Sequence, residues 1–229
     1  MNRPEGHARA RRMPRLILAS SSPRRRQLLS DLGLPFEVRE SNVAEDEEAS
    51  GATGLAQAVE VARRLAQCKA EAVARSLGPE AAGAIEGVGV DGAVAVGPLV
   101  IGADTVVVLD GHILGKPRDA AEARGMLREL AGRRHTVVTG VAVCDVASGR
   151  SLVAHEETRV FMRGLAADEI AAYVATGEPL DKAGAYAVQG LGALLVERIE
   201  GCYFNVVGLP LARLGSMLES FGVRVLGGE

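Results

Sequence analysis

The apolar positions along this chain fall into two kinds of pattern, short continuous runs and longer stretches with helical spacing. Continuous apolar runs predict strands that are covered on both faces. Spacings of three and four residues predict helices with one buried face. By these criteria we expect strands at residues 15–19, 36–39, 99–109 and 194–199, and helices at 23–32, 55–77, 120–130, 167–176 and 210–221.

Two long segments in the second half of the chain, 137–146 and 152–162, predict an antiparallel hairpin. They flank a Ser148-Gly149 turn, and the stretch TRVFMR that begins at Thr158 alternates as a half-exposed strand should. Elsewhere strands and helices follow one another, which is typical of α/β proteins. We therefore expect an α/β fold with a mixed sheet.

Two segments have no periodic apolar face. Residues 1–14 are rich in arginine but have no apolar core of a signal peptide and no interleaved aromatic residues, so a disordered basic tail is favoured over a nucleic-acid arm. Residues 78–98 are rich in Gly and Ala and predict a flexible insertion. The remainder, 15–229, is expected to form a single domain.

Composition narrows the class of protein. The chain has 229 residues, of which 48% are hydrophobic and 24% charged, and its net charge is −3. These values are those of a globular protein, and the weak negative charge gives no general attraction to nucleic acid or membranes. Cys68, Cys144 and Cys202 are odd in number and far apart, which favours a reducing, cytoplasmic setting over a disulfide framework or zinc site. No apolar run reaches transmembrane length.

The densest polar cluster stands where the first strand should turn into a helix. Residues 16–29 read LILASSSPRRRQLL, with Ser22 placed as an N-cap and Pro23 in the first helical turn. A helix start attracts anions, and serine hydroxyls and arginine guanidiniums strengthen that attraction. We favour a phosphate site over a simple cap with a solvated arginine face. It is not a Walker loop, since no G-x-x-x-x-G-K-[ST] occurs.

Two charged residues interrupt apolar patterns. Lys69 lies on the apolar stripe of the helix at 55–77, where it either extends its ammonium to water or serves a function. Asp104 interrupts the run LVIGADTVVVL, and a buried carboxylate must be hydrogen-bonded, paired or metal-bound. A structural aspartate that accepts backbone N–H groups is the alternative to a catalytic one.

Seven blocks carry a resemblance to a known family: LASSSPRR, RLAQCKA, GADTVV, LGKP, HTVVTGVAV, EPLDKAGAYAVQG and NVVGLPL. Their order and spacing over residues 16 to about 218 resemble those of the Maf family of nucleoside triphosphate pyrophosphatases. The resemblance implies a mixed α/β fold like that of inosine triphosphate pyrophosphatases, with two lobes around a nucleotide cleft. It also implies hydrolysis of a nucleoside triphosphate to the monophosphate and pyrophosphate with a divalent cation, Mg²⁺ or Mn²⁺.

The resemblance assigns roles to individual residues. Asp104 matches the proton acceptor and would also bind the metal ion, together with an acidic loop residue, Glu45 or Glu47. Arg24, Thr105 and Gln189 match positions associated with substrate choice. The motif blocks that line the cleft contribute further residues to substrate binding, namely Ser20, Arg25, Lys69, Lys116 and Lys182.

The family has a branch that acts on dTTP and UTP and one that acts on 7-methyl-GTP. The pyrimidine branch combines GADT with a glutamine in the QG block, and this sequence has both, as Thr105 and Gln189. We therefore expect a dTTP/UTP pyrophosphatase. The alternatives are a 7-methyl-GTP pyrophosphatase and a nucleotide-binding regulator of septum formation. The expected partner is a nucleoside triphosphate, without nucleic acid or membrane, and a homodimer is left open.

Overall fold

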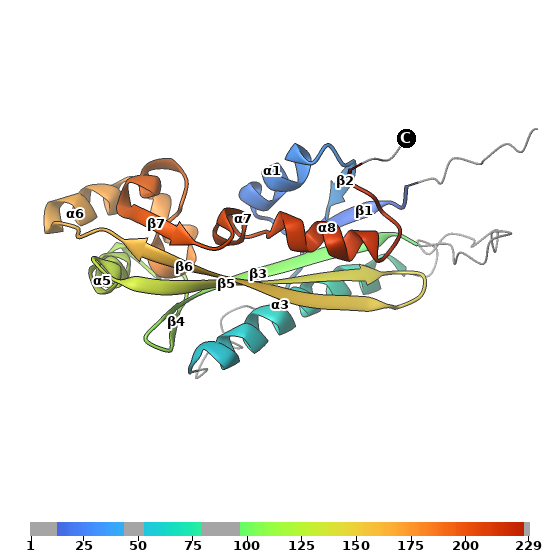
Figure 1. Cartoon of the computed structure of the whole chain (residues 1–229), viewed down its shortest axis with the longest axis horizontal. Helices are drawn as coiled ribbons and strands as arrows, with labels where there is room; N and C mark the ends of the chain where they lie inside the picture. The colour runs from blue at the N-terminus through green and yellow to red at the C-terminus, as the bar shows by residue number, and fades with distance from the viewer. Residues whose placement is uncertain (1–12, 44–52, 79–96, 227–229) are drawn as a thin grey trace, which may run out of the picture.

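The computed structural model describes residues 13–43, 53–78 and 97–226. The expected basic tail and Gly/Ala-rich insertion fall largely outside these residues, as do Glu45 and Glu47. A mixed sheet of seven strands runs through the molecule (Figure 1) in the order β2-β1-β3-β5-β6-β7, with β4 also paired to β3. The strands are β1 (Leu16–Ala19), β2 (Phe36–Val38), β3 (Leu99–Leu109), β4 (His112–Leu114), β5 (Arg134–Asp145), β6 (Ser151–Met162) and β7 (Val196–Glu200).

The expected mixed α/β sheet is confirmed. Strand β1 is parallel to β2 and β3, whereas β3, β5, β6 and β7 are joined by antiparallel pairing. Within the described residues, the helices are α1 (Pro23–Asp31), α3 (Leu55–Ser76), α5 (Ala120–Leu130), α6 (Ala167–Ala175), α7 (Tyr203–Val207) and α8 (Leu211–Glu219), and the 3₁₀ turns are η1 (Glu178–Asp181), η2 (Ala183–Ala185) and η3 (Gly190–Leu195).

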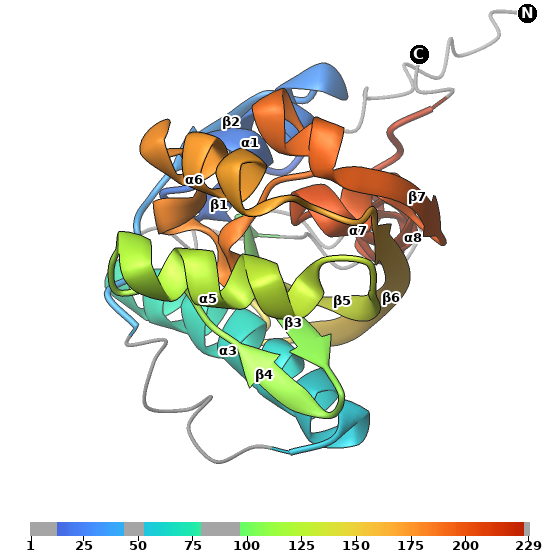
Figure 2. The ribbon, with the colours of Figure 1, turned by 90° about the vertical axis from the view of Figure 1, so that its left-hand side faces the viewer.

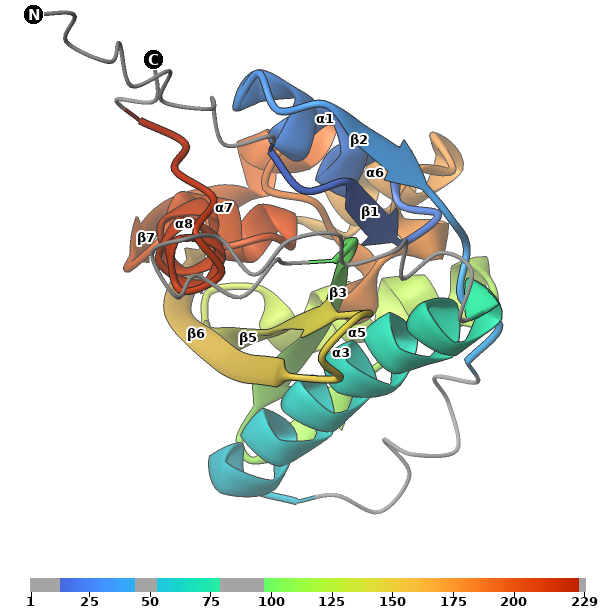
Figure 3. The same ribbon diagram turned by 90° about the vertical axis from the view of Figure 1, so that its right-hand side faces the viewer.

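Helix α3 covers one face of the sheet, and α1, α7 and α8 lie on the other (Figures 1 and 3). Because strand side chains alternate between the two faces, even-numbered residues of β3 such as Val100 and Val106 pack with α3. Odd-numbered residues such as Ile101 and Val107 pack on the opposite face. Asp104 and Thr105 therefore belong to opposite faces of the sheet.

Helix α3 lies unusually close to the sheet at two glycines. A Cβ atom on Gly102 of β3 would stand 2.2 Å from the carbonyl oxygen of Ala66, and one on Gly140 of β5 would stand 2.1 Å from that of Ala62. Both distances are far below van der Waals contact, so only glycine fits. This close approach fixes the depth at which α3 carries Lys69 toward β3.

The face opposite α3 holds two separate apolar clusters. One is built by β1, α1 and α8 on the first parts of β3 and the last parts of β5. The other is built by α5 and α6 at the opposite end of the sheet, which faces the viewer in Figure 2. These two clusters correspond to the two lobes that the family resemblance implies.

Most expected elements are present within a few residues of their predicted bounds, and β3 and α5 match exactly. The sequence did not predict β4, α7 or the three 3₁₀ turns, because each is too short to show a period. The expected strand at 194–199 starts later, since residues 190–195 form η3. Strand β4 exists because Asp110 and Gly111 both have positive φ, 50° and 83°, which returns the chain onto β3.

The three cysteines are free thiols, as their spacing predicts. Within the described residues, no helix is both long and apolar enough to cross a membrane.

We predict that Gly140→Ala lowers the free energy of unfolding by about 1–3 kcal/mol, since the added methyl group collides with the backbone of α3. Urea unfolding measures the loss. The matched control is Gly125→Ala in the middle of α5, where nothing lies within 4 Å of the added methyl group. That variant should gain about 0.5–1 kcal/mol from helix propensity. Equal effects at the two glycines would contradict the close approach of α3.

Candidate active site

The candidate site lies where the edge of β3 has no strand partner. Strand β5 pairs with one edge of β3 along nearly its full length. On the other edge, β1 pairs with residues 99–102 and β4 with residues 107–109. Within the described residues, no strand pairs with this edge between 103 and 106. The interruption leaves the backbone edge that carries Asp104 and Thr105 without a strand partner.

A cleft of about 310 Å³ opens at this interruption. Its walls come from the turn between β1 and α1, from α3 and β3, and from the loop between α6 and β7. Apart from the acidic loop residue, Glu45 or Glu47, which lies outside the described residues, the cleft brings together every site residue predicted from the sequence: Ser20, Arg24, Arg25, Lys69, Asp104, Thr105, Lys116, Lys182 and Gln189.

The start of α1 forms one wall of the cleft. Ser22 is the N-cap, and its hydroxyl accepts a hydrogen bond from the Arg25 N–H at 3.5 Å, with Pro23 in the first turn as expected. Ser20 is buried, with 6% of the residue exposed, and its hydroxyl accepts a hydrogen bond from the Ser22 N–H at 3.2 Å. All residues from Ser20 to Arg25 line the cleft, so the positive end of α1 and two guanidiniums border the same space.

A buried ion pair forms the floor of the cleft. The Lys69 ammonium on α3 lies 2.6 Å from Oδ1 of Asp104 on β3, and the two residues are only 4% and 6% exposed. Lys69 therefore does not extend its ammonium to water, and that alternative interpretation of the sequence is wrong. The two side chains partner each other where neither is well solvated, so each holds the other in place at the floor of the cleft.

The loop after α6 forms the wall that carries Lys182. Its ammonium donates to Asp181 at 2.6 Å and to the carbonyl of Glu178. Burial raises the pKa of the Asp181 carboxyl, but the hydrogen bond and charge of Lys182 and the charge of Arg24 together outweigh burial, and the pKa lies below its ordinary value. Lys182 thus reaches the cleft as half of an ion pair.

Gln189 lies in a segment that Glu178 and Tyr173 hold in place. The Glu178 carboxylate accepts hydrogen bonds from the Tyr173 hydroxyl at 3.0 Å and from the N–H groups of Leu191 and Gly192 at 3.2 and 3.0 Å. Burial acts to raise the pKa of Glu178, but these hydrogen bonds outweigh it and lower the pKa. Because the backbone of Leu191 and Gly192 is held by these hydrogen bonds, the backbone position of the nearby Gln189 is held as well.

The sequence did not single out several residues of the site. Ser41, Asp181 and Tyr186 also line the cleft. Tyr186 bonds to the buried His135 at 2.7 Å, and burial lowers the pKa of His135 to about 4, so this histidine is neutral. The sequence gives no signal for His135, because it is preceded by Arg133 and Arg134 and followed by Thr136.

The charges of the cleft favour a polyanion. Its lining includes five cationic residues and two acidic ones, although the whole chain carries a net charge of −3. Phosphate groups are the anions that guanidiniums, ammoniums and a helix start bind together. A single buried carboxylate among these cations adds a group able to accept a proton or bind a cation. The fold and cleft thus define a phosphate-binding protein with an enzyme-like site.

Comparison with known proteins agrees with this class. The family model described as "Maf-like protein" matches residues 15–221, and the chain belongs to the Maf family. A dTTP/UTP pyrophosphatase of Pelotomaculum thermopropionicum is 55% identical over 214 residues, which are 93% of this chain and all of the relative. Proteins of the same name from Moorella thermoacetica and Symbiobacterium thermophilum are 50% and 49% identical, over 94% of this chain and 99% and 98% of theirs.

We predict that Lys69→Met lowers the free energy of unfolding by about 3–5 kcal/mol, because it leaves the buried Asp104 carboxylate without its ammonium partner. Urea unfolding measures the loss. The double variant Lys69→Met/Asp104→Asn removes the uncompensated charge and should recover a large part of the lost stability. A double variant no more stable than Lys69→Met would show that the ion pair does not govern the packing of α3 on β3.

Proposed function

We propose that this chain hydrolyses dTTP and UTP to the nucleoside monophosphate and pyrophosphate. The observation that carries the proposal is the buried Asp104 carboxylate at the floor of a cleft whose other charged groups are mostly cationic. A protein that only binds the nucleotide does not require a carboxylate at this position. The Maf relatives named dTTP/UTP pyrophosphatase, similar over nearly their whole length, support the same activity.

The cations of the cleft offset the charge of the triphosphate. The start of α1 supplies N–H groups and hydroxyls, and Arg24 and Arg25 supply guanidiniums suited to two phosphate oxygens at once. Lys116 and Lys182 add point charges from the other walls of the cleft. Placing these charges before the reaction begins stabilises the charge that develops on the leaving pyrophosphate.

Asp104 is proposed to act on the attacking water. Its carboxylate accepts a proton from water as the water oxygen bonds to the α-phosphorus. The bond from the α-phosphorus to the oxygen that bridges it to the β-phosphorus breaks, and pyrophosphate leaves with that electron pair. Lys69 orients the carboxylate from the α3 side throughout.

The residues present fit a divalent cation. Among the described residues, no group of three or more His, Cys, Asp or Glu side chains is placed to hold a metal ion. Mg²⁺ is commonly held by one or two carboxylates together with substrate phosphates, and Asp104 at the cleft floor can supply one of them. Mg²⁺ or Mn²⁺ bound there would add positive charge beside the phosphates. We propose Asp104 as the ligand, with Glu45 or Glu47 as the second acidic partner.

Gln189 is proposed to select the base. Its carboxamide offers both an acceptor and donors, so it can pair with the N3–H and a carbonyl of uracil or thymine. A 7-methylguanine carries positive charge and a donor edge, for which a carboxylate is the better partner. The proposed substrates are therefore dTTP, UTP and their modified forms, and 7-methyl-GTP is the alternative substrate to be tested.

We predict that Asp104→Asn lowers the rate of pyrophosphate release by about 10²–10⁴-fold while nucleotide binding stays measurable, because the amide cannot accept the water proton. Pyrophosphate release from UTP, followed with a coupling pyrophosphatase and phosphate detection, measures the rate. The matched control is Asp145→Asn, a buried carboxylate at the end of β5 that caps the Gly97 and Ala147 N–H groups. It should lower stability and keep turnover. Wild-type turnover in Asp104→Asn would refute the catalytic role.

We further predict that the wild type prefers UTP and dTTP over 7-methyl-GTP, with weak activity on ATP and GTP. Gln189→Glu should lower kcat/KM for UTP by at least tenfold, because one hydrogen-bond donor to the base is lost. Measuring kcat/KM for the panel on both proteins tests this. A wild-type preference for 7-methyl-GTP would overturn the substrate, and an unchanged Gln189→Glu profile would overturn only the role of Gln189. No pyrophosphate release from any triphosphate would favour a regulator.

A further inference from the structure

A line of buried polar groups crosses the sheet between its two apolar clusters. Thr105 of β3 and Thr139 of β5 are directly opposite each other in the strand register, and their hydroxyl oxygens lie 2.9 Å apart. On β5, Val137 belongs to one apolar cluster and Val141 to the other, so Thr139 stands at the boundary. Thr139 is fully buried. A fully buried hydroxyl at such a boundary calls for a reason beyond packing.

The direction of the hydrogen bonds along this line is fixed. The Thr139 hydroxyl donates to the carbonyl oxygen of Asn205 at 2.9 Å, since a carbonyl can only accept. A hydroxyl has a single proton, so toward Thr105 the Thr139 oxygen accepts and Thr105 donates. The proton of Thr105 is thereby committed to Thr139. Toward every other group, Thr105 can only accept.

The group that Thr105 accepts from is the guanidinium of Arg25. Arg25 Nη2 lies 3.1 Å from the Thr105 hydroxyl oxygen, its Nε donates to the Gly208 carbonyl at 2.8 Å, and its Nη1 donates to Ser20 at 3.4 Å. Two N–H groups of the guanidinium are thus held by Thr105 and Gly208, which lie far from Arg25 in the sequence. The same arginine lines the cleft beside Arg24.

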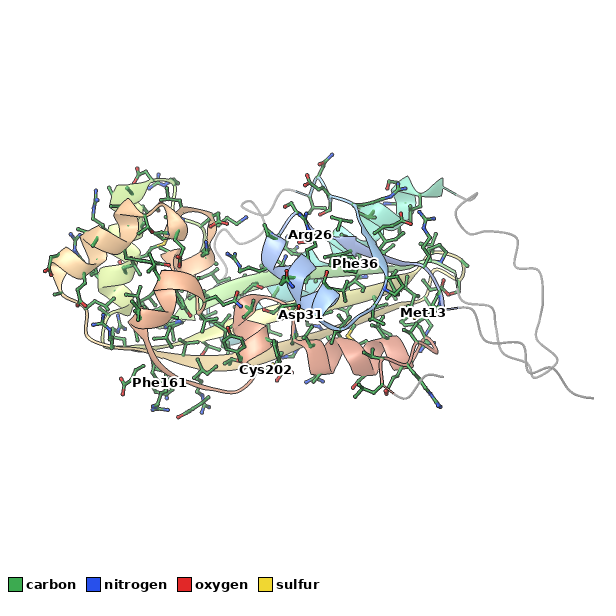
Figure 4. The ribbon with its side chains drawn as sticks, turned by 90° about the horizontal axis from the view of Figure 1, so that it is seen from above. Met13, Arg26, Asp31, Phe36, Phe161 and Cys202 are labelled. Carbon is green, nitrogen blue, oxygen red and sulfur yellow. The ribbon has the colours of Figure 1, made fainter. Side chains whose placement is uncertain are left out.

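Helix α7 anchors both ends of this arrangement. The carbonyl oxygen of Asn205, within α7, accepts the hydrogen bond from Thr139. The carbonyl oxygen of Gly208, the residue that ends α7, accepts the hydrogen bond from Arg25. The helix is itself fixed by the buried Asn205 side chain, which donates to the Val137 carbonyl at 3.0 Å and to Thr158 at 2.9 Å. Seen from above, α7 follows Cys202 and lies beside α1, which carries Arg26 and Asp31 (Figure 4).

We propose that Thr105 contributes to substrate binding by holding the guanidinium of Arg25, and that Thr139 is a positioning residue that fixes Thr105 as a hydrogen-bond acceptor. This inference rests on the proposed function only in taking the ligand of the cleft to be a triphosphate. The chain Arg25–Thr105–Thr139–Asn205 holds the guanidinium in one orientation before the phosphates arrive. Thr105 itself cannot donate to a phosphate or to a base carbonyl, and it already accepts from Arg25, so we assign it to holding the guanidinium and not to contact with the base.

The test compares threonine variants on substrates with different bases. Thr139→Val keeps the shape but removes both hydrogen bonds, and we expect kcat/KM to fall about tenfold for UTP and for GTP alike. Thr139→Ser keeps the hydroxyl and should stay near the wild type. Thr105→Val should show the same loss, and the double valine variant should be no worse than the single ones, since both interrupt one chain. Thr136→Val, on β5 but on the α3 face, is the matched control and should be neutral.

Inorganic tripolyphosphate, which has no base, separates this inference from the proposed function. Its affinity, measured by calorimetry without turnover, should fall about tenfold in Thr105→Val and Thr139→Val and be restored in Thr139→Ser. An additive double variant, an altered UTP-to-GTP ratio in Thr105→Val, or wild-type affinity for tripolyphosphate in Thr105→Val would overturn the inference. If Thr139→Val fails to fold, Thr105→Val and Thr139→Ser decide the matter by the same criteria. A wild type that binds tripolyphosphate in this way but does not hydrolyse UTP would contradict only the proposed function.

Discussion

The interruption of the β3 edge is the constraint on which the site depends. Strand β1 ends at Ala19, opposite Gly102, and β4 begins to pair only at Val107. If β1 were four residues longer, it would pair with the edge that now borders the cleft. Because β1 stops there, the chain turns directly into α1, and the positive end of that helix borders the same cleft as the unpaired edge of β3. One strand end thus produces both the opening and the anion site that borders it.

The alternation of side chains along β3 places two adjacent site residues on opposite faces of the sheet. Asp104 points toward α3 and meets Lys69, whereas Thr105 points toward α1 and α7 and meets Arg25. The two residues are adjacent, so the proposed proton acceptor and the phosphate-binding guanidinium are placed by the same short backbone segment. Both sides need close packing, supplied on the α3 side by Gly102 and Gly140 and on the other by Gly208. A shift of the register of β3 by one residue would exchange the two roles and destroy both.

The sequence predicts the strongly periodic parts of this molecule and misses the parts that depend on distant partners. The apolar runs and helical spacings locate β3, α5 and α3 because each is long enough to show its period. Asp104 and Lys69 are found because each breaks such a period. Thr139 gives no comparable signal, since threonine is common in strands and its partner is a carbonyl 66 residues away. The resemblance to the Maf family identified the blocks around these residues, but only the structure shows which atoms meet.

The two apolar clusters explain why the polar line between them can exist at all. Burying hydroxyls and an amide is unfavourable unless each finds a partner, and here Thr105, Thr139, Thr158 and Asn205 satisfy one another or the backbone. The Asn205 Oδ1 atom has no hydrogen-bond partner within the described residues, so the arrangement is not optimal for stability alone. Apolar side chains in place of these polar groups would join the two clusters into one core and stabilise the fold, but Arg25 would lose its hydrogen bond to Thr105. The line of buried polar groups therefore lowers the stability of the fold but holds the Arg25 guanidinium at the cleft.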